Sequence, residues 1–360
     1  MDQINQRSHG LDLLRILSML MVVILHLLGA GGVLAALDPG GVRYVSAWGM
    51  EVVASCAVNC YGLLSGYVGY GRSHAKKKLG VLWLQVFLTS VLLSWGVGLF
   101  FQGSLSWKEL LYPALPVVTV QYWYFTAYFG LSLLMPYLDR MLAGLDGRQT
   151  WDLMVTLVVL FSVLPLFAEG DLFATHAGYS LLWLATLYLL GACVKRYEHK
   201  SRPSWQYVLG YGLCMILALV GKLGGDILSA HYFPNHALGA KAMSYTSPAI
   251  LLGSLLLLLL FRQVKAQGKW ARTLITFFAP LSFGVYIIHT NPKVWQYLLM
   301  NRMAWAAQLP APLLLIAVTG IAAAVFLVCA MVDFVRHTLF RLCGRLWAGK
   351  TAEQEPAGRV

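Results

Sequence analysis

Long apolar stretches follow one another along most of the chain and alternate with short polar segments. A helix that crosses a membrane needs about 20 predominantly apolar residues. Ten segments fit this length, at residues 11–29, 44–69, 79–101, 119–138, 151–168, 176–194, 205–222, 244–261, 272–289 and 311–335. The pattern predicts an all-α, polytopic membrane protein with about ten transmembrane helices.

The composition agrees with this pattern, since 59% of the 360 residues are hydrophobic and 12% are charged. Soluble domains carry roughly 45–50% apolar and about 25% charged residues, so a soluble class is excluded. The first apolar run contains Asp12, Arg15 and His26, which a cleaved export signal does not need. We expect one membrane domain over residues 1–345 and a short disordered cytoplasmic tail over 346–360.

The formal charge of +12 comes from Lys and Arg residues in short segments between the apolar runs. Loops rich in Lys and Arg stay cytoplasmic, and here every second loop is rich in them. This alternation predicts that both termini are inside. These loops and the C-terminal flank hold most of the cations, namely Arg72, Lys76, Lys77, Lys78, Arg140, Arg148, Lys195, Arg196, Lys200, Arg202, Arg262, Lys265, Lys269, Arg272, Arg336, Arg341, Arg345, Lys350 and Arg359. No basic domain with interleaved aromatic residues occurs, which favours membrane lipids over nucleic acid as partners.

Two ionisable residues, Arg15 and His26, lie within the first predicted helix. Such side chains are costly in hydrocarbon, so they normally face a cavity or a partner. Eleven helical steps separate them by roughly 16 Å along the axis and return to nearly the same side. The sequence therefore predicts a cation toward the cytoplasm and an imidazole toward the outer leaflet, on one face of one helix.

The second predicted helix runs in the opposite direction, which places Glu51 at the depth of His26. A carboxylate there could fix the imidazole tautomer and stabilise its protonated form. Alternatively, Glu51 neutralises Arg43 or lies in water near the outer mouth. Asn59 and Ser65 lie nearer the inner end, where Ser65 could equally serve close helix packing through small residues.

Further polar and aromatic residues collect at the outer level. Trp123 and Tyr124 open the fourth predicted helix, and Ser282, Tyr286 and His289 form one stripe of the ninth. The stripe indicates that His289 lines the cavity of His26, whereas Trp and Tyr at a helix mouth most often form an interfacial belt. No HxxxH, HExxH or CxxC pattern occurs, so no metal site is expected.

Four stretches together are similar to one known family. GLDLLRILSMLMVVILHLLG contains Arg15 and His26 in an R-x10-H arrangement, and NCYGLLSGYVGY, YWYFTAYFGLSLLMPYL and FGVYIIHT follow in order. They resemble motifs of the membrane-bound acyltransferase-3 family of bacterial O-acyltransferases. The chain departs from the family in two respects. It lacks the hydrolase-like domain of some members, and Asn59-Cys60-Tyr61 replaces a common Phe-Phe pair.

The resemblance implies a multi-pass enzyme of the bacterial plasma membrane, with residues 1–345 as an acyltransferase-3-like domain. Cytoplasmic acyl-CoA, commonly acetyl-CoA, would be the donor, with no metal, and the acceptor would be a hydroxyl of a glycan or lipid-linked sugar at the outer side. A transporter or flippase of lipid-linked glycans is the alternative.

The catalytic residues would be His26 as general base, Arg15 as a contact for CoA phosphates, and Glu51. Tyr124, Asn59 and Arg15 are alternative groups for stabilising the oxyanion. The expected substrate-binding residues are Asn59, Ser65, Trp123, Tyr124, Tyr286 and His289.

Overall fold

The computed structural model describes residues 8–74, 76–197, 201–233 and 236–353. These residues form helices joined by turns, with no β-strand among them, which confirms the all-α prediction. Eight helical segments are long and apolar enough to cross a membrane. Their bounds are His9–Leu28, Val42–Gly69, Lys76–Gln102, Gly147–Phe167, Ser204–His231, Leu238–Phe261, Lys269–His289 and Ala311–Phe340.

Several of these segments are interrupted and consist of more than one helix. The second contains α2 (Val42–Ala54) and α3 (Ala57–Gly69), and the fourth contains α7 (Gly147–Val158) and α8 (Leu164–Phe167). Two more are divided in the same way, into α11 (Leu238–Met243) and α12 (Pro248–Phe261), and into α13 (Lys269–Phe278) and α14 (Ser282–His289). The uninterrupted helices are α1 (His9–Leu28), α4 (Lys76–Gln102), α10 (Ser204–His231) and the last helix, α16 (Ala311–Glu353).

The remaining two of the ten predicted segments form helices with a weaker membrane signal. α9 (Leu181–Arg196) has 16 residues, fewer than the roughly 20 that a span requires. α6 (Trp123–Gly144) has 22 residues, but its tyrosines and the Asp139-Arg140 pair reduce its apolar character. Composition therefore supports eight spans, and the expected count of ten stays a prediction.

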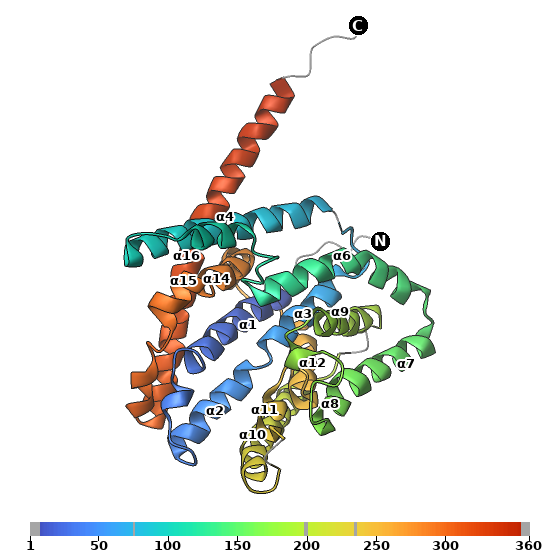
Figure 1. The fold of residues 1–360 in the computed structure, drawn as a ribbon. Coiled ribbons are helices and arrows are strands. Elements are labelled where there is room, and N and C mark those ends of the chain that lie inside the picture. The colour runs from blue at the N-terminus through green and yellow to red at the C-terminus, as the bar shows by residue number, and fades with distance from the viewer. Residues whose placement is uncertain (1–7, 75, 198–200, 234–235, 354–360) are drawn as a thin grey trace.

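The last helix, α16 (Ala311–Glu353), extends further than the pattern predicted. It passes the expected helix end at residue 335 and the expected domain boundary at 345, and it projects beyond the other helices (Figure 1). Residues 346–353, expected to be a disordered tail, are therefore helical, and residues 354–360 lie outside the described residues.

Helix α1 lies at the centre of the bundle (Figure 1). Its start is capped by the Ser8 hydroxyl, which accepts from the Leu11 amide. It contacts a large group of helices, namely α2, α3, α12, α13, α14 and α16. This central position explains why α1 can carry polar side chains that the lipid would not tolerate.

Helices α3 and α9 pack closely because each has a glycine where the backbone of the other helix approaches. A Cβ at Gly66 would lie 1.9 Å from the Tyr188 carbonyl oxygen, and one at Gly191 would lie 2.1 Å from that of Leu63. Between membrane helices such close packing supplies much of the attraction, since apolar burial adds little there. The small residues around Ser65 thus fix the position of α3 beside α9.

The segment between α4 and α6 folds into short helices, including α5 (Trp107–Leu111). Its Ser106 and Glu109 form a capping box at the start of α5. An ion pair with Lys293, just after α14, lowers the pKa of the Glu109 carboxyl to about 2. This ion pair fastens the segment to α15 (Pro292–Val294).

The α3–α9 contact leads to a first prediction. Gly66→Ala should destabilise the protein by about 1–3 kcal/mol or more, because the new methyl group meets backbone that cannot move aside easily. Thermal unfolding in detergent would measure the loss. Gly212→Ala on α10, where a Cβ meets nothing within 4 Å, is the control and should unfold like the wild type. Equal unfolding temperatures for both variants would contradict the packing argument.

Candidate active site

The imidazole of His26 is held by a second histidine from a distant part of the chain. His26 Nδ1 lies 2.9 Å from His289 Nε2, and His289 lies at the end of α14. The indole of Trp295 packs edge-on against His26, with ring centroids 4.8 Å apart. His289 is almost completely buried, whereas His26 is partly exposed to a cavity. His289 and Trp295 therefore fix the His26 ring from two directions.

The hydrogen bonds assign the protons when both rings are neutral. His289 Nδ1 lies 2.6 Å from the Val285 carbonyl oxygen, which can only accept, so this nitrogen carries the hydrogen. His289 Nε2 is then an acceptor, and the His26 Nδ1–H group donates to it. Nε2 of His26 is left with a lone pair. This is the nitrogen that can take a proton from another molecule.

A small cavity surrounds His26, with a volume of about 60 Å³. We call it the His26 cavity. It is lined by Met19, Val22, Leu25, His26, Val58, Tyr61, Trp123, Tyr124, Tyr179, Tyr245, Phe283 and Tyr286. Its walls are mainly apolar or aromatic, so charges inside it would be poorly screened.

A second cavity, the Arg15 cavity, lies toward the start of α1 and has a volume of about 380 Å³. Arg15, Tyr61, Ser65, Tyr124 and Tyr128 are among its lining residues. The Arg15 guanidinium donates to Asp12 Oδ1 at 2.6 Å, and the Tyr61 hydroxyl donates to the Arg15 carbonyl oxygen at 2.8 Å. The Arg15 side chain is 33% exposed, so it remains accessible from the cavity despite its ion pair.

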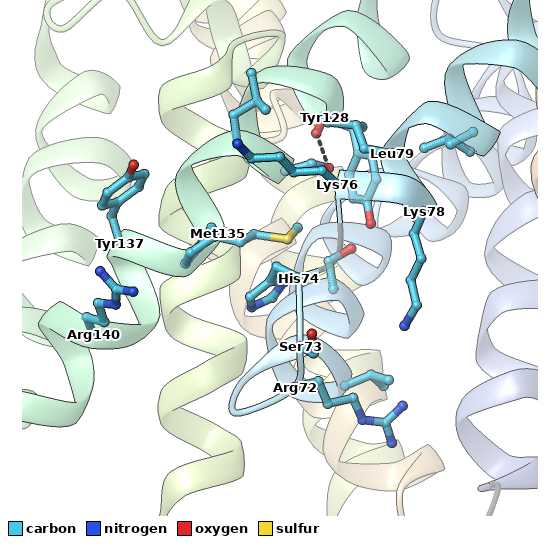
Figure 2. Close-up of a pocket in the computed structure, with 17 residues that line it drawn as sticks. Arg72, Ser73, His74, Lys76, Lys78, Leu79, Tyr128, Met135, Tyr137 and Arg140 are labelled. Atoms are coloured by element: carbon cyan, nitrogen blue, oxygen red, sulfur yellow. Dashed lines mark hydrogen bonds between the residues drawn. The ribbon is translucent and has the colours of Figure 1, made fainter. Parts of the chain in front are cut away.

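A third cavity, which we call the basic mouth, has a volume of about 440 Å³ and lies between the end of α3, the start of α4 and α6. Figure 2 shows its cationic side chains, which are Arg72, Lys76, Lys78 and Arg140. His74 also lines it, and none of the described lining residues is acidic. An anionic group would therefore be attracted to this end of the bundle.

The Arg15 cavity adjoins both of the others. Tyr61, Tyr124 and Phe283 line both the His26 cavity and the Arg15 cavity. Ser65 and Tyr128 line both the Arg15 cavity and the basic mouth. The three cavities thus follow one another in the order basic mouth, Arg15 cavity and His26 cavity. Arg15 lines the middle cavity of the three and is not among the described residues of the basic mouth, where the sequence had suggested that it would contact phosphates.

Glu51 does not hold His26 as expected, because His289 supplies that hydrogen bond. Glu51 Oε2 is buried and has no hydrogen-bond partner among the described residues, and its electrostatic partner is Lys222 on α10. Arg43, the alternative partner considered, donates instead to the Ala307 carbonyl oxygen. The rotation of α2 about its axis decides this outcome, and depth along the helix could not reveal it.

Asn59, expected to bind substrate, has a structural position instead. It is fully buried, donates to the Tyr245 carbonyl oxygen at 2.8 Å and accepts from the Trp183 indole at 2.9 Å. It is not among the described residues that line the three cavities. Asn59 therefore joins α3 to α9 and to the segment before α12.

The other predicted binding residues have two kinds of position. Trp123, Tyr124 and Tyr286 line the His26 cavity, and the Tyr286 hydroxyl accepts from the Tyr124 amide at 3.3 Å. Ser65 lines the Arg15 cavity and the basic mouth. His289 lies behind His26, where its contact is with the imidazole itself. We expected it in the wall of the cavity.

Sequence reasoning missed several residues of these cavities. Tyr128 follows Tyr124 by one helical turn, and this aromatic stripe could have indicated it. Tyr179 and Tyr245 come from connecting segments and meet at ring centroids 5.0 Å apart, a contact without a periodic signal. Arg72 and Lys78 were interpreted as topology-setting charges, although they also line a cavity.

Comparison with known proteins identifies one family. The family model described as "Acyltransferase domain" matches residues 8–332, which is most of the chain. Searches of curated proteins and of solved structures find no match. The matched region begins just before α1 and ends within α16, so it contains all three cavities.

The bonding of Asn59 gives a second prediction. Asn59→Ala should lower stability by about 1–3 kcal/mol for each group left unsatisfied, because the Trp183 indole N–H and the Tyr245 carbonyl lose their partner. Thermal unfolding in detergent measures this, with Gln206→Ala, a partly exposed amide at the start of α10, as the control. If Asn59→Ala unfolds at the same temperature as the wild type, the structural role is contradicted and Asn59 is again a candidate for substrate binding.

Proposed function

Because the chain belongs to the acyltransferase-3 family and is a membrane acyltransferase, we propose the following reaction. The enzyme moves an acetyl group from cytoplasmic acetyl-CoA to a hydroxyl of a cell-surface glycan or lipid-linked sugar. It would act in the bacterial plasma membrane, with the acceptor at the outer side. The observation that carries the proposal is the series of adjoining cavities that joins the basic mouth to His26.

The basic mouth suits the phosphate-rich end of a CoA ester. Arg72 and Arg140 can form paired, charge-assisted hydrogen bonds with phosphate, and Lys76 and Lys78 add positive charge. The narrow pantetheine arm would then extend through the Arg15 cavity. Arg15 would contact the donor between the basic mouth and the reacting thioester. The sequence had suggested that Arg15 contacts the phosphates, which would instead lie farther from the thioester, in the basic mouth.

The chemistry would take place at His26. Its Nε2 accepts the proton of the acceptor hydroxyl as that oxygen attacks the thioester carbonyl carbon. The carbon–sulfur bond then breaks, and the sulfur takes the proton from His26 and leaves as the free thiol of CoA. The products are an ester and CoA, and the imidazole returns to its initial state.

His289 would position the base without touching substrate. By accepting from His26 Nδ1, it presents Nε2 to the cavity and can stabilise the positive charge that His26 gains. Tyr124 lines both the His26 and Arg15 cavities and is our candidate for stabilising the oxyanion. Asn59, the other uncharged candidate, is occupied by its structural hydrogen bonds.

The acceptor would approach past the aromatic residues of the His26 cavity. Trp123 and Tyr179 have ring centroids 4.5 Å apart, and the Tyr179 side chain is half-exposed. Aromatic faces with polar edges suit a sugar ring, which has apolar C–H faces and hydroxyls around its rim. These rings support a carbohydrate acceptor and would leave one hydroxyl directed toward His26.

The test is the release of free thiol from acetyl-CoA by the purified protein, supplied with membranes that contain the acceptor. Mass spectrometry of the glycans would follow the ester formed. His26→Ala should lower the rate by about 10²–10⁴-fold, because the general base is lost, while protein abundance stays normal. His231→Ala, an exposed histidine on α10, is the control and should react like the wild type. Near-normal turnover of His26→Ala would remove the proposed base.

Arg15 gives a separate prediction about the donor. Arg15→Ala should raise the KM for acetyl-CoA by about tenfold, the effect of one lost charge-assisted hydrogen bond. Initial rates at varied acetyl-CoA would measure it, with Arg148→Ala, an exposed arginine on α7, as the control. An unchanged dependence on donor concentration would leave Arg15 as a structural cation paired with Asp12.

A further inference from the structure

One carboxylate behind the basic mouth accepts hydrogen bonds from three separate parts of the chain. Asp139 Oδ2 accepts from the Gly71 amide at 3.1 Å and from His74 Nε2 at 2.9 Å. Asp139 Oδ1 accepts from the Tyr188 hydroxyl at 2.6 Å. Asp139 lies on α6, Tyr188 on α9, and Gly71 and His74 in the connection that follows α3. The side chains of Asp139 and His74 are 14% and 16% exposed, so both are largely shielded from solvent.

The two residues that donate to Asp139 Oδ2 flank Arg72, one of the cations of the basic mouth, in the sequence. Gly71 and His74 lie on either side of Arg72 and Ser73, and both of these residues line the basic mouth (Figure 2). Gly71 has a φ of +73°, a conformation that glycine adopts without strain and that turns the chain out of α3. The Arg72 amide donates to the Gly69 carbonyl oxygen at 3.0 Å. The backbone on both sides of Arg72 is therefore fixed.

We propose that Asp139 is a positioning residue for the donor, because it holds the Gly71–His74 segment and so directs Arg72 into the basic mouth. The inference rests on the proposed function, since the anion at the mouth would be the phosphates of CoA. Tyr188 holds the other carboxylate oxygen and links this arrangement to the α3–α9 contact. Asp139 is not itself among the residues that line the mouth.

The sign of the effect separates positioning from simple electrostatics. Asp139 carries a negative charge close to a cluster of cations, so neutralising it without moving anything would attract an anionic donor more strongly. If Asp139 instead keeps Arg72 in place, the same substitution weakens binding. Asp139→Asn has nearly the same shape, but its single amide oxygen cannot accept from Gly71 and His74 on one side and also from Tyr188 on the other.

The experiment is titration calorimetry of the full-length protein in detergent with CoA, together with acetyl-CoA kinetics. Asp139→Asn should weaken CoA binding about tenfold and raise the KM for acetyl-CoA similarly, since roughly one charged contact is lost. Its kcat should stay within about twofold, because His26 and His289 are untouched. Asp152→Asn on α7, an exposed aspartate, removes the same charge and should bind CoA like the wild type.

Two further variants make the test decisive. Tyr188→Phe removes one of the three hydrogen bonds and should weaken CoA binding by a smaller factor, about two- to threefold. If Asp139→Asn does not fold, Tyr188→Phe still tests the positioning role. In an Arg72→Ala background, Asp139→Asn should add little, because the residue it positions is already absent.

Each result has a definite meaning. Equal or tighter CoA binding by Asp139→Asn, equal binding by Tyr188→Phe, or full additivity with Arg72→Ala would overturn the positioning role and leave the proposed reaction standing. If the wild-type protein neither binds CoA nor releases thiol from acetyl-CoA, the proposed function fails and this inference fails with it.

Discussion

An ionisable or polar side chain among apolar helices must meet either a partner or a cavity, and this constraint organises the whole bundle. Arg15 pairs with Asp12, and His26 is bonded to His289. Each pair leaves one member accessible from a cavity, Arg15 in the first and His26 in the second. The partner stabilises the polar residue in the bundle, and the cavity leaves it available for chemistry.

The same constraint distinguishes structural polar residues from functional ones. Asn59 uses its amide to join three segments and lines none of the cavities described, so its polarity stabilises the bundle. In its assigned tautomer, His26 keeps one nitrogen that bonds to none of the described residues, and His26 lies in a cavity wall. Counting the hydrogen bonds of each buried group therefore says more about its role than its residue type does.

Positive charge has two consequences in this chain. The distribution of Lys and Arg between the helices is the basis for predicting which loops are cytoplasmic. The residues after α3 and on α6 also converge on one mouth, which opens toward the Arg15 cavity. The cations of this mouth thus have a second consequence beside their place in the loop pattern, since together they attract anions. Asp139 lies behind these cations and connects them to α9.

Local properties of the sequence determined the helices, because apolar length and helical period depend on neighbouring residues alone. For the same reason, the spacing of Arg15 and His26 placed both on one side of α1, where each lines one of two adjoining cavities. Only the tertiary structure decided that His289, 263 residues away, and not Glu51, bonds to His26. It also brought Tyr179 and Tyr245 together from connecting segments and extended α16 to Glu353. Such contacts depend on how helices rotate and pack against one another, which the period within a single helix does not specify.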